Sequence, residues 1–153
     1  IEKASEKEMQ IILNPSPYNN KLDKCDLNKI SLFLVNEIEG EQITGEKEPD
    51  EILKKFSQMY PDASVVLTLG GDGAVYQDKK GIYRQGIFPV KAVDTTAAGD
   101  TFTGYFLASV LEKMSPEEGL RMAAKASSIA VSRLGAAASV PMRNEVMEAL
   151  ERE

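Results

Sequence analysis

The chain has 153 residues, a normal size for one domain, and is 42% hydrophobic and 27% charged, as expected of a folded globular protein. Eighteen Lys and Arg residues against 24 Asp and Glu residues give a net charge of −6, which argues against broad binding to a nucleic-acid backbone. The chain contains no histidine, which excludes a Ser-His-Asp triad and a histidine-ligated metal. A general base here would be Asp, Glu, Lys, Tyr, Cys or a bound water.

Cysteine usage and hydropathy indicate the setting. Cys25 is the single cysteine, so no internal disulfide can form, which favours a reducing, cytoplasmic location. No apolar run approaches the roughly 18 to 20 residues of a membrane span. The charged start, residues 1–8, is not typical of a signal peptide and lacks an initiator Met. We therefore expect no membrane partner and a sequence that begins inside a longer protein.

Strands and helices alternate in the first half of the predicted structure. Residues 9–13 and 30–35 are apolar runs that predict strands, and residues 64–69 predict the best-defined strand of the chain. Helices are expected over residues 38–45 and 49–60, the second with an apolar stripe and with proline in its first turn.

Short strands and then helices are expected in the second half. The three predicted strands cover residues 74–77, 82–84 and 88–92, with a tight turn between the first two. The predicted helices follow Asp100, run from Ser115 to about Arg133, and run from an Asn144 cap to Glu151. This order predicts an α/β layered fold with a mostly parallel sheet, as one domain or part of one.

The strongest candidate for chemistry is the segment Asp94-Thr95-Thr96-Ala97-Ala98-Gly99-Asp100. Its small residues allow a ligand to approach the backbone, and the amides of Ala98, Gly99 and Asp100 open a helix, whose N-terminus suits a phosphate. Asp100 could accept a proton from an attacking hydroxyl, as in phosphoryl transfer. The alternative is that Asp100 only caps the helix.

A glycine-rich turn follows the strand predicted at residues 64–69. Its sequence, Thr68-Leu69-Gly70-Gly71-Asp72-Gly73, matches neither the dinucleotide-binding pattern nor the phosphate-loop pattern. A nucleotide could lie against this turn, but a purely structural turn is the simpler interpretation.

Asn36 and Glu39 lie where a predicted strand gives way to a helix, at the sheet edge where α/β proteins bind ligands. Asn36 could contact a phosphate, and Glu39 could hold Mg²⁺ through water. The alternative, which the local pattern alone favours, is ordinary helix capping in an acidic turn.

Residues 94–102 resemble the C-terminal signature of the phosphofructokinase-B type sugar kinases, the ribokinase family. Further segments resemble this family in the same order along the chain: residues 14–17, 35–41, 43–45, 66–70 and 129–141. The resemblance covers essentially the whole chain, and the Asn-Pro-x-Pro segment and the tail are most similar to the family's ribose kinases. It implies a three-layer αβα ribokinase-like fold with a mostly parallel central sheet, of which the N-terminal half and the lid are absent.

The resemblance implies transfer of the ATP γ-phosphate to the O5 hydroxyl of D-ribose, or to fructose, another sugar or a nucleoside. Asp100 would be the catalytic base, and the amides of Ala98 and Gly99 would form the anion hole. Nucleotide contacts would come from Asn36, Thr68, Leu69, Gly70, Gly71, Asp72, Gly73, Gly99, Asp100 and Ala124. Mg²⁺ would lie near Glu39, and K⁺ would have the ligands Asp94, Thr96, Ala130, Arg133, Gly135 and Ser139, several through backbone carbonyls.

The chain departs from the family pattern at three points. Ala97 stands where the signature usually has glycine, and Ala124 replaces an adenine-pocket residue that is often Asn or His. The family's N-terminal half, which supplies most of the sugar pocket, has no counterpart here. We therefore expect the full-length enzyme, by resemblance a homodimer, to be active and the isolated chain to bind nucleotide at best. A catalytically inert ATP-binding module is the alternative from another class.

Overall fold

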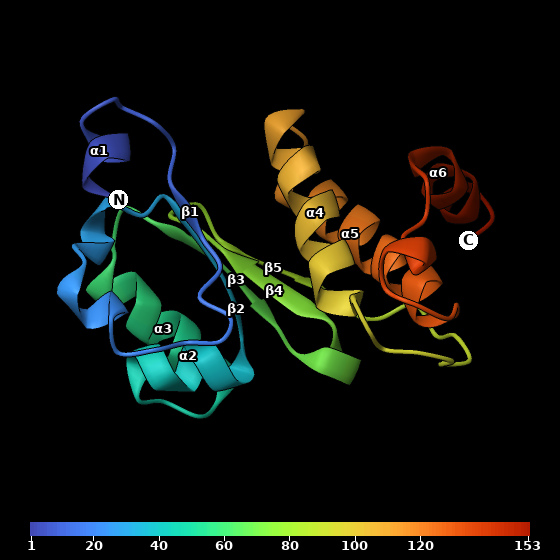
Figure 1. Ribbon diagram of the computed structural model, residues 1–153, viewed down its shortest axis with the longest axis horizontal. Coiled ribbons are helices and arrows are strands. Elements are labelled where there is room, and N and C mark those ends of the chain that lie inside the picture. The colour runs from blue at the N-terminus through green and yellow to red at the C-terminus, as the bar shows by residue number, and fades with distance from the viewer. The chain divides into compact units, whose positions relative to one another are not determined.

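A computed structural model describes residues 1–153, and the chain forms two units within it (Figure 1). Unit 1 contains Ile1–Gly70 and Val75–Ile82, and unit 2 contains Gly71–Ala74 and Tyr83–Glu153. The predicted site residues are therefore divided between the two units, and each unit is described below by itself.

The strands form one five-stranded sheet in the order β1-β2-β3-β4-β5. They span Ile12–Leu13, Leu32–Asn36, Ser64–Thr68, Ala74–Gln77 and Ile82–Gln85. The β1–β2 and β2–β3 pairs are parallel, and Asn36 lies opposite Thr68 at the carboxyl ends of β2 and β3. The α/β class with a mostly parallel sheet is thus confirmed, and carboxyl strand ends are where such sheets bind ligands.

Helices α2 (Glu37–Thr44) and α3 (Pro49–Met59) both contact β3 in unit 1. Pro49 occupies the first turn of α3, and the buried Ile52, Leu53 and Phe56 confirm the predicted apolar stripe. The Phe33 and Phe56 rings meet with centroids 5.2 Å apart in the core beneath them. The remaining elements of this unit are α1 (Glu2–Ser5) and two 3₁₀ turns, η1 (Leu22–Lys24) and η2 (Leu27–Lys29), none of which the sequence pattern predicted.

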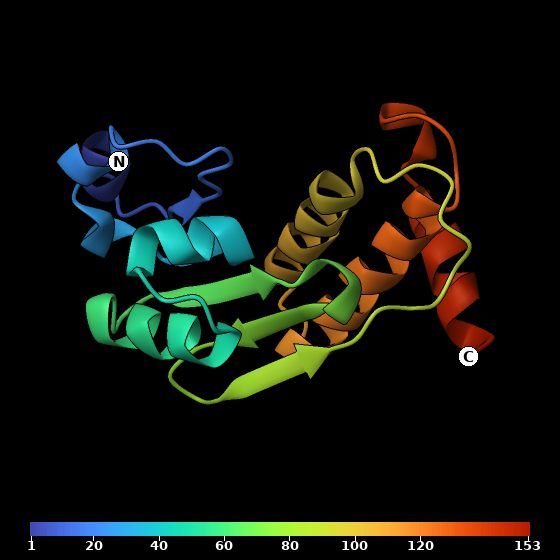
Figure 2. The same cartoon turned by 90° about the horizontal axis from the view of Figure 1, so that it is seen from below.

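Unit 2 is mainly helical, with α4 (Ala98–Leu111) and α5 (Pro116–Val131) packed side by side (Figure 2). The predicted capping box at the start of α5 is present: the Glu118 amide donates to Ser115 Oγ and the Ser115 amide donates to Glu118 Oε2. α6 (Arg143–Glu151) packs on α5 around a small core that includes Met122, Ala126 and Val146. Two further 3₁₀ turns are η3 (Gly70–Asp72) and η4 (Ala137–Ser139).

One predicted strand is absent, and the predicted cap of the last helix is wrong. Residues 88–92 form a loop rather than a strand: Pro89 cannot donate to a strand ladder, and Val90 is exposed. The last helix begins at Arg143, so Asn144 lies inside it, and Met142 is the cap residue. There the Glu145 carboxylate accepts the Met142 amide at 2.7 Å, which takes the capping role assigned to Asn144.

None of the helices combines the length and the apolar character that crossing a bilayer requires.

Candidate functional site

The N-terminus of α4 carries two free amides among the three predicted for an anion site. The first helical hydrogen bond runs from the Thr101 amide to Ala97 O at 2.8 Å, and the Ala98 amide donates to Thr95 O at 3.2 Å. The amides of Gly99 and Asp100 donate to no acceptor in the chain. An anion can therefore bind to two of the three predicted amides, while the Ala98 amide is engaged in closing the turn.

Asp100 is exposed in the first turn of α4 and does not cap the helix. The cap position belongs to Ala97, whose left-handed backbone (φ 62°, ψ 10°) turns the chain into the helix without any side-chain hydrogen bond. The capping alternative for Asp100 is therefore wrong, and its carboxylate is available to a ligand. The positive φ also explains why glycine suits this position: an L-residue there costs about 1–2 kcal/mol.

A cavity of about 370 Å³ extends along α4 from Asp100, within the size range of small-molecule sites. A Glu112–Arg143 ion pair lies at its far end. Its exposed surface is mostly apolar although three of the lining residues are charged, and the lining comprises Asp100, Thr101, Gly104, Tyr105, Ala108, Glu112, Met122, Val140 and Arg143.

Asp94 hydrogen-bonds to two of the other residues that the resemblance assigns to the cation site. Its Oδ1 accepts the Thr96 amide at 2.9 Å, and its Oδ2 accepts the Gly135 amide at 3.0 Å. Hydrogen bonds from the Thr96 side chain, then from the Thr96 and Gly135 amides, hold the pKa of Asp94 below its ordinary value. The carboxylate is thus kept ionised where the family resemblance implies a monovalent cation.

The other predicted cation ligands lie on α5 and in the turns that follow it. The Arg133 guanidinium pairs with Glu145 at 2.6 Å and has no acceptor atom, so the backbone carbonyl is the only group of Arg133 that could bind a cation. Ser139 is fully buried and its hydroxyl donates to Ala136 O, while Ala130 is buried in α5. No three acidic or cysteine side chains gather in the way a metal site of such ligands requires. Any cation here would therefore depend largely on backbone carbonyls.

Two residues of α5 that the sequence pattern did not single out hold the same region. The Ser127 hydroxyl donates to Ala98 O at 3.1 Å, and the Lys125 ammonium lies 4.5 Å from the centroid of the Phe88 ring. Neither contact has a sequence signal, because both join residues about thirty or more positions apart. Ala124, which the resemblance places beside the adenine, is buried on α5 directly before Lys125.

In unit 1, Asn36 and Glu39 form a capping box at the start of α2. The Glu39 amide donates to Asn36 Oδ1 at 2.9 Å, and the Asn36 amide donates to Glu39 Oε2 at 3.0 Å. The capping interpretation is therefore confirmed, and Glu39 is only 5% exposed. Asn36 Nδ2 and Glu39 Oε1 take no part in the capping box, so each side chain keeps one polar atom that could contact a ligand.

The glycine-rich turn has the structural role that its composition suggested. Gly70 (φ 52°) and Gly73 (φ 95°) adopt left-handed backbone, and a Cβ on Gly73 would lie 2.1 Å from Gln85 O. Among the earlier residues of the turn, Thr68 donates its hydroxyl to Val35 O, and Leu69 packs against the core of unit 1. Gly71 and Asp72, in the middle of the turn, are exposed.

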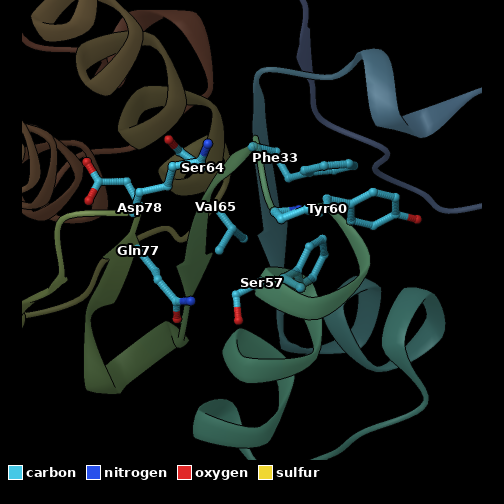
Figure 3. A pocket seen from close by; sticks show the side chains of 11 residues that line it. Phe33, Ser57, Tyr60, Ser64, Val65, Gln77 and Asp78 are labelled. Carbon is cyan, nitrogen blue, oxygen red and sulfur yellow. The ribbon is translucent and has the colours of Figure 1, made fainter.

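A second cavity lies in unit 1 at the amino end of β3, between Phe33, Tyr60 and Gln77 (Figure 3). Its volume is about 50 Å³, which has room for water but is far below that of a ligand site. The buried Gln77 Oε1 has no partner in the chain, and a water in this cavity would satisfy it. Because Ser64 begins β3 and Thr68 ends it, this cavity is at the edge of the sheet opposite Asn36 and Thr68.

Comparison with known proteins places these features in a family. The chain is 38% identical to the ribokinase of Haemophilus influenzae over 97% of its own length and 49% of that protein's. It superposes on the ribokinase of Thermotoga maritima with a TM-score of 0.83 and 31% identity, covering 97% of this chain and 52% of that one. For the ribokinase of Arabidopsis thaliana complexed with ribose and ATP, the TM-score is 0.81 at 31% identity, over 95% and 49% of the two chains.

The chain therefore has the fold of the ribokinases and spans about half the length of the relatives it matches. The model of the pfkB family carbohydrate kinases matches residues 1–143, which include every predicted site residue. The chain belongs to the pfkB family of carbohydrate kinases.

Proposed function

We propose that this chain is the C-terminal, nucleotide-binding and catalytic part of an ATP-dependent sugar kinase that phosphorylates the O5 hydroxyl of D-ribose. The family match and the ribokinase relatives at 30–38% identity support a sugar kinase. The ribose and ATP held by the Arabidopsis ribokinase support this choice of substrates. Kinases for fructose, another sugar or a nucleoside remain the competing assignments within the family.

The observation that carries the proposal is the pairing of two free amides with a free carboxylate at one helix end. The amides of Gly99 and Asp100 would bind the γ-phosphoryl group of ATP, where the positive end of the α4 dipole also favours negative charge. The Asp100 side chain lies in the same first turn and engages no other group of the chain. Phosphoryl transfer requires these two functions, charge stabilisation and a proton acceptor, next to one another.

The proposed step is an in-line transfer. The sugar hydroxyl oxygen attacks the γ-phosphorus, the bond from that phosphorus to the bridging oxygen of ADP breaks, and the hydroxyl proton passes to the Asp100 carboxylate. The two amides hold the equatorial oxygens of the transferring group. Most of the acceleration would come from positioning and from charge stabilisation, since the protein forms no covalent bond to the phosphoryl group.

Two cations fit the residues present. Glu39 Oε1, outside the capping box of unit 1, could bind a hydrated Mg²⁺. The ionised Asp94, linked to Gly135 and Thr96, suits a monovalent cation such as K⁺ together with carbonyls of Ala130 and Arg133 and with Ser139. In our proposal Asp94 fixes the loop that precedes the anion site.

The proposed role as one part of a larger domain is supported by two observations. The relatives are about twice as long as this chain. The cavity beside Asp100 is lined by the exposed Gly104 and Ala108, and Leu111 farther along α4 is 80% exposed. An apolar helix face of this kind is usually covered. We propose that the sugar-binding half of the domain covers it and brings the acceptor hydroxyl to Asp100.

The test has two arms. Calorimetry of this chain with ATP and Mg²⁺ should show binding that does not require ribose. The full-length protein should release ADP when given ribose, faster than with fructose or a nucleoside, and faster with K⁺ than without it. Nucleotide binding without turnover on any acceptor would instead favour the inert module, and absence of heat at millimolar ATP would count against a preformed nucleotide site.

A further inference from the structure

The loop from residue 86 to residue 97 leads into the proposed phosphate site without any helix or strand of its own. Most of its apolar side chains are exposed, including Ile87, Val90 and Val93. Phe88 is the half-buried exception in the first part of the loop. The contacts that hold this loop therefore help to determine the backbone geometry of residues 94–100.

One helix, α5, holds this loop and the start of α4 at three levels. Val131 O accepts the amides of Val93 at 2.9 Å and Asp94 at 3.2 Å, and Ser127 Oγ donates to Ala98 O at 3.1 Å. The third contact comes from Lys125, two residues before Ser127 and six before Val131, whose ammonium lies 4.5 Å from the centroid of the Phe88 ring. The backbone contacts hold the end of the loop, and the Lys125 contact holds its beginning.

Lys125 is unusual for a lysine because only 9% of the residue is exposed. A buried ammonium is costly unless it is paired, and here it pairs with the carboxylate of Glu153 while it lies over the aromatic face of Phe88. Glu153 thus fixes the direction of the Lys125 side chain, and Phe88 is the group on which that side chain acts. Nothing in the proposed phosphoryl transfer uses this charge directly.

We infer that Lys125 is a positioning residue of the nucleotide site: it clamps the 86–97 loop onto α5 through Phe88, so that the Asp94–Asp100 segment is held ready for phosphate. The effect of Lys125 on ATP binding rests on the proposed function, whereas its effect on the 86–97 loop does not. The clamp adds no ligand to the site. Its contribution is to hold residues 94–100 in place beforehand, so that less conformational entropy is lost when the nucleotide binds.

The test substitutes Lys125→Met, which keeps the length of the side chain and removes its charge. Amide hydrogen exchange reports the loop directly, because the Val93 and Asp94 amides are protected only by Val131 O. We expect these two amides to exchange about five to ten times faster, and the dissociation constant for ATP to rise by a similar factor. Amides of α3, in the other unit, should not change.

Two further variants serve as controls. Lys125→Arg keeps a cation over the ring and should restore both readouts, whereas Lys54→Met removes an exposed lysine paired only with Glu51 and should change neither. If Lys125→Met does not fold, Phe88→Leu gives the same test, since it keeps an apolar side chain without an aromatic face.

The outcomes separate the two proposals. Unchanged exchange at Val93 and Asp94, or faster exchange with unchanged ATP affinity, overturns the positioning role of Lys125. If the unsubstituted chain binds no ATP, the proposed function fails together with the effect of Lys125 on ATP binding, while the exchange rates still decide whether the clamp exists.

Discussion

Asp94 Oδ2 accepts a hydrogen bond from the Gly135 amide at 3.0 Å, and this contact joins two segments 41 residues apart in the sequence. The same carboxylate closes the turn at Thr96, so one side chain fixes the loop before α4 and the turn after α5 to each other. Both ends of the proposed cation site therefore depend on the ionised form of Asp94.

The pH dependence of this contact has a defined sign. Because hydrogen bonds hold the pKa of Asp94 below its ordinary value of 3.8 in the folded state, its stabilising effect is fully present above pH 3.8 and is lost as the pH falls through the lower, folded value. Asp94→Asn should lower the free energy of unfolding at pH 7, and the difference from the unsubstituted protein should shrink steadily below pH 4. Urea unfolding at several pH values measures this, and a difference that does not depend on pH would contradict it.

Ala97 is strained by its left-handed backbone at φ 62°. Ala97→Gly should therefore raise the free energy of unfolding by about 0.5–1 kcal/mol, the relief of strain minus the greater freedom of glycine in the unfolded chain. The matched control is Ala108→Gly, at an exposed position inside helix α4, which should lower stability by about 0.5–1 kcal/mol. Loss of stability in Ala97→Gly would show that the Cβ makes a contact that outweighs the strain.

Asn36 has a capping role and a proposed ligand-binding role, and two substitutions can separate them. Asn36→Ala should lower the free energy of unfolding by about 1 kcal/mol, because the Glu39 amide loses its acceptor. Asn36→Ser keeps a capping oxygen and should restore that stability. If Asn36 also contacts the nucleotide, Asn36→Ser will still bind ATP and Mg²⁺ more weakly; full recovery of affinity by calorimetry would reduce Asn36 to a cap.

Gly73 and Gly71 lie in the same turn but have different constraints. A Cβ on Gly73 would lie 2.1 Å from Gln85 O at a φ of 95°, whereas a Cβ on Gly71 meets nothing within 4 Å. Gly73→Ala should therefore lower the free energy of unfolding by about 2 kcal/mol or more, and Gly71→Ala by much less. Thermal unfolding of the two variants measures this. Equal unfolding midpoints would contradict the prediction, because they would mean that Gln85, at the end of β5, moves aside without loss of stability.

The segments with strong local signals were predictable from the sequence. The Ser115–Glu118 capping box, Pro49 at the start of α3 and the apolar run of β3 all determine their own conformation, because the interactions concerned are local. The predicted strand at residues 88–92 was wrong because the conformation of this segment depends on non-local contacts. Its apolar residues do not enter a sheet core, and the loop is held by contacts with α5 that no short-range pattern encodes.

The candidate site was predictable only in part. The small residues and the Asp of the 94–100 segment indicated an anion site, but not that Thr95 O would engage the Ala98 amide or that Ala97 would take the cap position. The contacts of Lys125 with Phe88 and of Ser127 with Ala98 depend on how α5 packs, so residue types alone could not reveal them.

The most direct test of the account is the replacement Asp100→Asn in the full-length protein, with ribose-dependent ADP release measured beside ATP binding. Loss of the proton acceptor should lower turnover by about 10²–10⁴-fold, while the dissociation constant for ATP changes little because the Gly99 and Asp100 amides remain. Asp62→Asn, which affects only an exposed pair with Lys79, should leave both quantities unchanged. Turnover by Asp100→Asn equal to that of the unsubstituted enzyme would contradict the assignment of Asp100 as the base.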